Sequence, residues 1–217
     1  METRRLESFS DGVFAVAITL LVFNLLMIGD KTPSFTSLVS AAWPQYFAYV
    51  VGFLTIGIMW LSHHTMVRHA RQVDRVTLIL NIFLLMFVVA VPFPTALVAD
   101  NLNKPAAGPA VVAYGVLSIL LSIAFAAMWS YMSGHQESLA SLSAAQRLRS
   151  VLRFSAGLLG YIAGTVVAAL WSPIAGLIIF GLVAVYYLFE QLPSPPADGP
   201  DAAGQEPDAG LDGVTRG

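Results

Sequence analysis

Side chains that could do chemistry are few in this sequence, and they gather in two short segments. They are Ser10 and Asp11 near the N-terminus and Trp60, His63 and His64 further along. The carboxylate and the imidazoles can exchange protons or bind cations, whereas the hydroxyl and the indole N–H form hydrogen bonds. These two segments are therefore the candidates for a functional site.

Neither segment has the pattern of a metal centre or of an active site. His63 and His64 are adjacent, so on a helix they point to different faces, and the usual i,i+4 histidine pair is missing. Ser10 with one of these histidines is the only conceivable nucleophile and base. The sequence has no Gly-x-Ser-x-Gly segment, no phosphate-binding loop and no zinc-protease motif. We therefore expect no enzyme, no bound metal and no cofactor.

The composition identifies the elements that must position these residues. Hydrophobic residues make up 57% of the 217 and charged residues only 11%, about half the charged fraction of a soluble domain. The chain is therefore expected to be an integral membrane protein in contact with the lipid bilayer. No basic patch for nucleic acid is present, and the lack of cysteine excludes disulfides.

Hydrophobic segments long enough to cross a bilayer recur along the chain. We expect six transmembrane helices, over residues 9–28, 45–66, 76–94, 110–132, 151–171 and 173–190. The fold class is then all-α, with residues 1–190 as the transmembrane domain. Residues 191–217, rich in Pro, Gly, Ala and Asp, are predicted to form a disordered acidic tail. Gly160 and Gly164 have the spacing of a close helix–helix contact, within the subunit or outside it.

The basic residues predict the orientation. Eight of the ten that precede the tail fall on one side of a six-helix topology, namely Arg4, Arg5, Arg68, Arg71, Arg75, Arg147, Arg149 and Arg153. Lys and Arg near helix ends mark the cytoplasmic side. We therefore expect both termini in the cytoplasm, in a multi-pass protein of the plasma (inner) membrane.

The first helix has two faces. At about 100° per residue, Val16, Leu20, Phe23 and Met27 form one apolar stripe with Thr19 at its margin, while Asp11 points roughly 140° away. Ordinary helix packing would also produce such a stripe. Thr19 could equally bond to a carbonyl of its own helix.

Asp11 itself has two interpretations. Ser8-x-x-Asp11 has the form of a capping box at a helix N-terminus. Alternatively, Ser10 and Asp11 hydrogen-bond to Trp60 and one of the histidines, because the first helix begins and the second ends on the same side of the membrane. An acid within a spanning helix usually faces protein rather than lipid.

A family resemblance joins the two segments. Arg5-x-x-x-Phe9-Ser10-Asp11 at the start of the first helix, with Trp60-x-x-His63-His64 at the end of the second, closely resembles the bacterial branch of the transmembrane protein 175 family, the lysosomal-type potassium channels. The resemblance extends over the six-helix region to about Glu190. It implies a potassium-selective homotetramer that lacks the Thr-Val-Gly-Tyr-Gly filter of other potassium channels, and that filter is absent here.

The resemblance also implies roles for particular residues. The first helices would line the pore, with constriction rings at Val16, Leu20 and Phe23 and a contribution to selectivity from Thr19. Val16 stands where a larger Ile or Leu is more usual. A structural brace around the pore helix would consist of Arg5, Phe9, Ser10, Asp11, Trp60, His63 and His64. Potassium would be the permeant ion.

Two other function classes fit a six-helix membrane protein. A secondary transporter or proton-coupled permease for a small solute is the main alternative, although the chain lacks paired repeats and ionisable residues near the membrane midplane. A membrane scaffold without transport activity is the third. A current that persists without a gradient of a second solute would distinguish a channel from a transporter.

Overall fold

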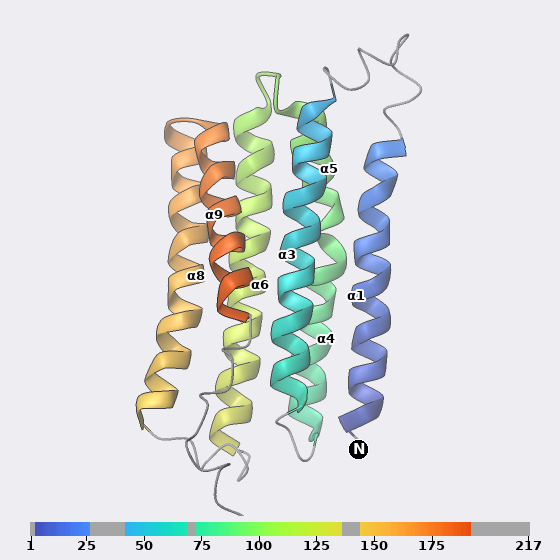
Figure 1. The fold of residues 1–217 in the computed structure, drawn as a ribbon, viewed down its shortest axis with the longest axis vertical. Helices are drawn as coiled ribbons and strands as arrows, with labels where there is room; N and C mark the ends of the chain where they lie inside the picture. Colours follow the sequence, from blue (N-terminus) through green and yellow to red (C-terminus); the bar gives the residue numbers. More distant parts are fainter. Residues whose placement is uncertain (1–2, 27–41, 69–72, 136–143, 192–217) are drawn as a thin grey trace, which may run out of the picture.

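The computed structural model describes residues 3–26, 42–68, 73–135 and 144–191, but not the side chains of residues 24, 26, 134–135, 144–156 and 190–191. The described residues form seven helices, which run along one long axis (Figure 1). They are α1 (Thr3–Leu26), α3 (Trp43–Arg68), α4 (Arg75–Ala90), α5 (Pro92–Asn101), α6 (Ala107–His135), α8 (Ala144–Leu170) and α9 (Pro173–Gln191). In Figure 1, α1 and α8 lie at opposite edges of this bundle.

The predicted all-helical membrane fold is confirmed. Among the described residues, four helical segments are long and apolar enough to cross a membrane, and they are Thr3–Phe23, Trp43–Arg68, Arg75–Asn101 and Ala107–Ser133. Two shorter apolar helical segments follow, Gly157–Leu170 and Pro173–Phe189. Because α4 and α5 together make one of these segments, the seven helices correspond to the six predicted ones.

The third helix was predicted to end too early. Its expected end at residue 94 is wrong, because α4 gives way to α5 at Val91 and the helical path continues to Asn101. Val91 keeps right-handed helical angles and donates its N–H to Val88 O, while Pro92 begins α5. A proline is tolerated at a first helical position, where its missing N–H has no partner to lose. Val91 O accepts from the backbone N–H of Thr95 at 3.2 Å and from its hydroxyl at 2.8 Å, so helical hydrogen bonding continues from Val91 into α5.

The capping interpretation of Asp11 is wrong. Helix α1 is already helical from Thr3, so Ser8 and Asp11 lie beyond its first turn, where backbone N–H groups have partners within the helix. The polar side chain of Asp11 therefore needs another explanation, which its contact with Trp60 of α3 supplies.

Glycines bring α8 and α9 into close contact within the subunit. A Cβ at Gly164 would lie 2.5 Å from Phe180 Cε1, and a Cβ at Gly160 would lie 2.4 Å from Val183 Cγ2. On the other side of the contact, a Cβ at Gly176 would lie 2.7 Å from the carbonyl oxygen of Gly164. The Gly160/Gly164 pair is therefore used inside the subunit, as lipid-embedded helices use small residues to approach closely.

The helix ends nearest the predicted cytoplasmic arginines lie together at one end of the bundle. In Figure 1 the start of α1, the end of α3, the start of α4, the end of α6 and the start of α8 all lie at the lower end. This arrangement agrees with an alternating six-segment topology. The predictions for Met27 and for the tail from residue 192 onward fall outside the described residues.

Candidate functional site

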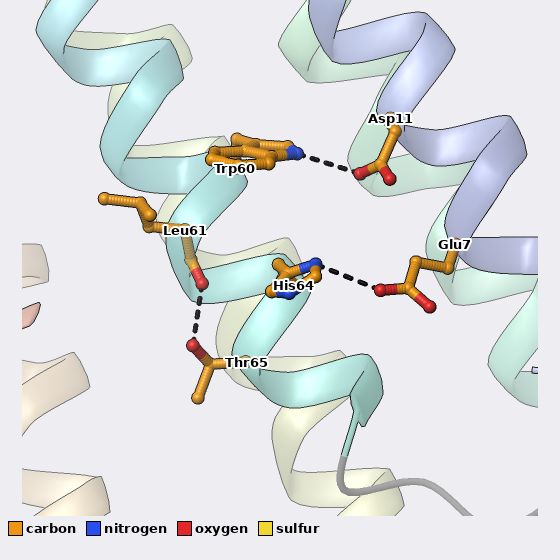
Figure 2. Close-up of polar contacts among 6 residues, drawn as sticks. All are labelled: Glu7, Asp11, Trp60, Leu61, His64 and Thr65. Atoms are coloured by element: carbon orange, nitrogen blue, oxygen red, sulfur yellow. Dashed lines mark hydrogen bonds and ion pairs between the residues drawn. The ribbon is translucent and has the colours of Figure 1, made fainter. Parts of the chain in front are cut away.

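The two segments singled out in the sequence meet where α1 packs against α3. The indole Nε1 of Trp60 donates a hydrogen bond to Asp11 Oδ1 at 2.8 Å (Figure 2). One turn closer to the end of the bundle, His64 Nδ1 lies 3.0 Å from Glu7 Oε1. That distance fits an ion pair, but Nδ1 has no contact with hydrogen-bond geometry among the described residues. The two side chains are therefore close enough for an ion pair, but no directed hydrogen bond joins them.

A second set of contacts lies behind these, completely buried between α1, α3 and α4. Asn81 Nδ2 donates to Ser10 Oγ at 3.1 Å, and Asn81 Oδ1 lies 2.8 Å from His63 Nε2. Since a carboxamide oxygen only accepts, His63 must carry its proton on Nε2. Asn81 therefore links the serine of α1 to the histidine of α3.

Burial makes this second set a structural requirement. Ser10 and His63 are 0% exposed and Asn81 is 1% exposed. A buried polar group is costly without a partner. Asn81 supplies a partner for Ser10 Oγ and for His63 Nε2, whereas His63 Nδ1 has no hydrogen-bond partner among the described residues. The His63 ring also packs on Phe14, with ring centroids 5.5 Å apart. We call Ser10, His63 and Asn81 the buried triad and use that name below.

Sequence analysis missed two members of the site. Neither Asn81 nor Glu7 was among the residues predicted for the site. An asparagine in an otherwise apolar spanning segment is itself a signal, because such residues are rare and face protein. Glu7 could have been found from its i,i+4 spacing to Asp11, which places both carboxylates on one face of α1.

The predicted pore residues lie on a face of α1 that the other described residues leave uncovered. Val16 is 54% exposed, Leu20 37% and Phe23 55%. Thr19 is exposed too, and its hydroxyl donates to Val16 O of the same helix at 2.8 Å. The local bond considered for Thr19 therefore exists. It uses the O–H, so the lone pairs of the hydroxyl oxygen remain available on the exposed side.

Arg5 and Phe9, the two other motif residues, are also exposed in the single chain. Phe9 is 60% exposed and lies on the same stripe as Val16. The brace seen here therefore consists of Ser10, Asp11, Trp60, His63 and His64 with the added Glu7 and Asn81.

These contacts fix one helix and leave one of its faces free. The polar side chains of α1 are used against α3 and α4, while no described part of the chain covers the apolar stripe. Ser10 faces Asn81 rather than a histidine base, so the serine and histidine do not form a nucleophile pair. The geometry therefore suits a positioned helix rather than a catalytic centre.

Comparison with known proteins identifies the family. The model of the family described as "Endosomal/lysosomal potassium channel TMEM175" matches residues 5–92, which include both segments of the site. A potassium channel of Streptomyces collinus is 40% identical over 199 residues, covering 89% of this chain and 95% of that protein. The human endosomal/lysosomal proton channel TMEM175 is 33% identical over 101 residues, which cover 42% of this chain but only 20% of the human protein.

A solved structure supports the same assignment. The crystal structure of a lysosomal potassium-selective channel TMEM175 homolog from Chamaesiphon minutus superposes with a TM-score of 0.73 at 30% identity. It covers 88% of this chain and 98% of that chain. The match therefore includes the second half of the bundle, beyond the residues of the family model. The protein described here belongs to the TMEM175 family.

Proposed function

We propose that this chain is a potassium-selective ion channel of the plasma membrane, built as a homotetramer around four copies of α1. The observation that carries the proposal is the uncovered stripe of Val16, Leu20 and Phe23 on a helix whose other side is held by buried hydrogen bonds. One chain contributes a single α1 at the edge of its bundle (Figure 1), so a pore along this stripe needs several chains. Four is the number that the family resemblance implies.

Exposure alone does not distinguish a pore from a lipid-facing surface. Helix α4 also exposes large apolar side chains, among them Ile82, Phe83 and Met86. The face of α1 differs because it also exposes Thr19, whose hydroxyl donates a hydrogen bond to Val16 O and whose oxygen can still accept. An oxygen with free lone pairs can replace part of the hydration shell of a cation.

The two kinds of residue would then have different effects on an ion. Rings of Val16, Leu20 and Phe23 side chains exclude water and offer no ligand, so they act as hydrophobic constrictions. A ring of Thr19 oxygens offers polar contacts beside them. The apolar rings restrict conduction, and the ring of Thr19 oxygens contributes to the preference for potassium over sodium.

The orientation is proposed from charge. Arg4, Arg5, Arg68 and Arg75 belong to helix ends that lie together, whereas Lys104 lies at the opposite end, between α5 and α6. An excess of Lys and Arg marks the cytoplasmic side. Both termini are then cytoplasmic.

The test is electrical recording from the purified protein in lipid bilayers with potassium on one side and sodium on the other. The wild type should show a reversal potential that favours potassium without a gradient of any second solute. Leu20→Asn should raise conductance and weaken selectivity, because it places four amide groups in one of the constriction rings. Thr19→Val should weaken selectivity while the protein still folds and assembles.

Val22→Asn is the matched control. Val22 is also exposed, at 39%, but it lies about 120° around the helix from Val16. Equal effects at Leu20 and Val22, or none at either, would show that this stripe does not line the pore. A current that requires a second solute gradient would favour the transporter, and a monomeric mass in detergent would exclude the proposed tetramer.

A further inference from the structure

Three side chains that can bind a cation converge between α1 and α3. Glu7 and Asp11 are one helical turn apart on α1, and His64 faces them from α3 (Figure 2). Each offers one ligand atom, and these three atoms lie within 4.8 Å of one another. The three residues belong to two different helices, so an ion held among them would join the helices.

The neighbouring contacts leave this set of donors available. Asp11 uses Oδ1 to accept from Trp60 Nε1 at 2.8 Å, which fixes the carboxylate, and its second oxygen accepts no hydrogen bond from the part of the chain that the structure describes. His64 Nδ1 is buried and, among the described residues, makes no hydrogen bond. A hydrogen bond that orients a ligating carboxylate is the usual support of a metal site. The side chains of His64 and Glu7 are 33% and 25% exposed, so an ion can reach them from water.

The donor set selects a class of ion. One imidazole nitrogen and two carboxylate oxygens suit Zn²⁺ and similar transition metals, with water as a fourth ligand. Mg²⁺ and Ca²⁺ require more oxygen ligands than two carboxylates supply. We propose that Glu7, Asp11 and His64 form a binding site for a divalent transition-metal ion that joins α1 to α3.

This site does not depend on the proposed channel function. It was not expected from the sequence, where only the adjacent histidines were considered as ligands. Its simplest competitor is an ion pair between Glu7 and a protonated His64, with Arg4 as a further cation on the same face of α1 by helical spacing. An ion pair alone predicts no saturable metal binding, so the two can be separated by experiment.

The first measurement is titration of the purified protein with Co²⁺ or Zn²⁺, followed by calorimetry and, for Co²⁺, by visible absorption. We expect saturable binding of one ion per subunit and a rise in the thermal unfolding temperature. Glu7→Gln and His64→Gln should each weaken binding by at least about tenfold, since even loss of a supporting residue costs 10- to 100-fold. Mg²⁺ should not compete. Asp100→Asn and His135→Gln, which change the same residue types elsewhere, should leave affinity unchanged.

A second measurement leaves all three ligands intact. The rings of Trp60 and His64 are 5.7 Å apart, so a bound Co²⁺ should quench Trp60 fluorescence, and Trp60→Phe should remove the saturable part of the quenching. This result does not require a ligand variant to fold. Absence of saturable binding, binding unaffected by Glu7→Gln and His64→Gln, or quenching unchanged in Trp60→Phe would overturn the proposal.

Discussion

The two halves of the bundle are held together by different means. In the first half, α1, α3 and α4 are joined by the buried triad and by the Trp60–Asp11 hydrogen bond. In the second half, α8 and α9 are joined by glycines that let backbone and side chains approach closely. Lipid removes the hydrophobic attraction between helices, so polar contacts and close packing are the two solutions that remain.

The boundary between these two kinds of helix contact coincides with the end of the family match. The family model matches residues 5–92, which contain the polar half, and not the glycine-packed half. A directed hydrogen bond fixes the rotation of a helix about its axis as well as its distance from a neighbour. The polar half therefore determines which face of α1 is turned outward, whereas the glycines mainly determine how near α9 lies to α8.

The largest expected effect is in the glycine-packed half. A Cβ at Gly176 would lie 2.6 Å from Ala168 Cβ and 2.7 Å from the carbonyl oxygen of Gly164, and a backbone atom cannot rotate away. Gly176→Ala should therefore lower the free energy of unfolding by about 3 kcal/mol, at the upper end of the usual cost of overpacking. The measurement is unfolding of the purified protein in mixed detergent micelles, followed by circular dichroism.

Gly181→Ala, on the same helix, is the matched control. No atom outside its own local helix lies within 4 Å of a Cβ there. Alanine should leave stability unchanged or raise it by up to about 1 kcal/mol through helix propensity. If both variants lost the same stability, close approach would not be what holds α9.

An intermediate effect is expected in the polar half. Asn81→Leu removes the link between Ser10 and His63 and leaves the buried His63 N–H without an acceptor. Interhelical hydrogen bonds in membranes contribute about 0.6 kcal/mol on average and up to about 1.7, so losing two should cost about 1–3 kcal/mol. Unlike Gly176→Ala, this change should also alter conductance, because it frees the rotation of α1.

Asn101→Leu controls for the loss of an asparagine. Among the described residues, the Asn101 amide donates to Leu97 O of its own helix, at 2.8 Å. We expect a change within about 0.5 kcal/mol, as for surface substitutions. Altered conductance in Asn101→Leu, or unaltered conductance in Asn81→Leu, would contradict the view that the buried triad sets the rotation of α1.

Much of the fold could be predicted because hydropathy and length determine where a chain crosses a membrane. The prediction failed where backbone hydrogen bonding around prolines determines whether a helix ends or continues. Pro92 and Pro94 looked like the end of a helix, yet the helical path continues, since Val91 stays helical and Thr95 bonds to its carbonyl. The GxxxG spacing predicted a close contact, but the identity of its partner, α9, depended on tertiary structure.

The site was predictable only in part. Asp11 and Trp60 were recognised from a paired motif, but Asn81 lies on a third helix and its role depends on how α4 packs against both others. No spacing rule connects it to Ser10, 71 positions away. The roles of Val16, Thr19, Leu20 and Phe23 stay predictions, because a pore requires neighbouring subunits.

The smallest expected effect lies at the connection between the two halves. Asp74 caps the N-terminus of α4 by accepting from Thr77 N at 2.9 Å, and its carboxylate also accepts from the hydroxyls of Thr77 and Tyr131, the latter on α6. The Thr77 hydroxyl is the main reason that the pKa of Asp74 lies below its ordinary value of 3.8, and the Tyr131 hydroxyl adds to it. Because Asp74 is exposed, solvent screens the charge and the cap itself dominates.

Asp74→Ala should therefore lower the free energy of unfolding by about 1 kcal/mol near neutral pH, the usual cost of losing an N-cap. A carboxylate whose pKa is lowered on folding stabilises the protein above its ordinary pKa of 3.8 and loses that contribution as the pH falls through its folded value. The difference between wild type and Asp74→Ala should thus shrink in acid, when both are unfolded in micelles over a range of pH. Thr77→Val should move this loss to higher pH, because it removes the hydroxyl that contributes most to lowering the pKa. A difference that stays constant as the pH falls well below 3.8, or grows there, would mean that the charge of Asp74 does not contribute to joining α4 and α6.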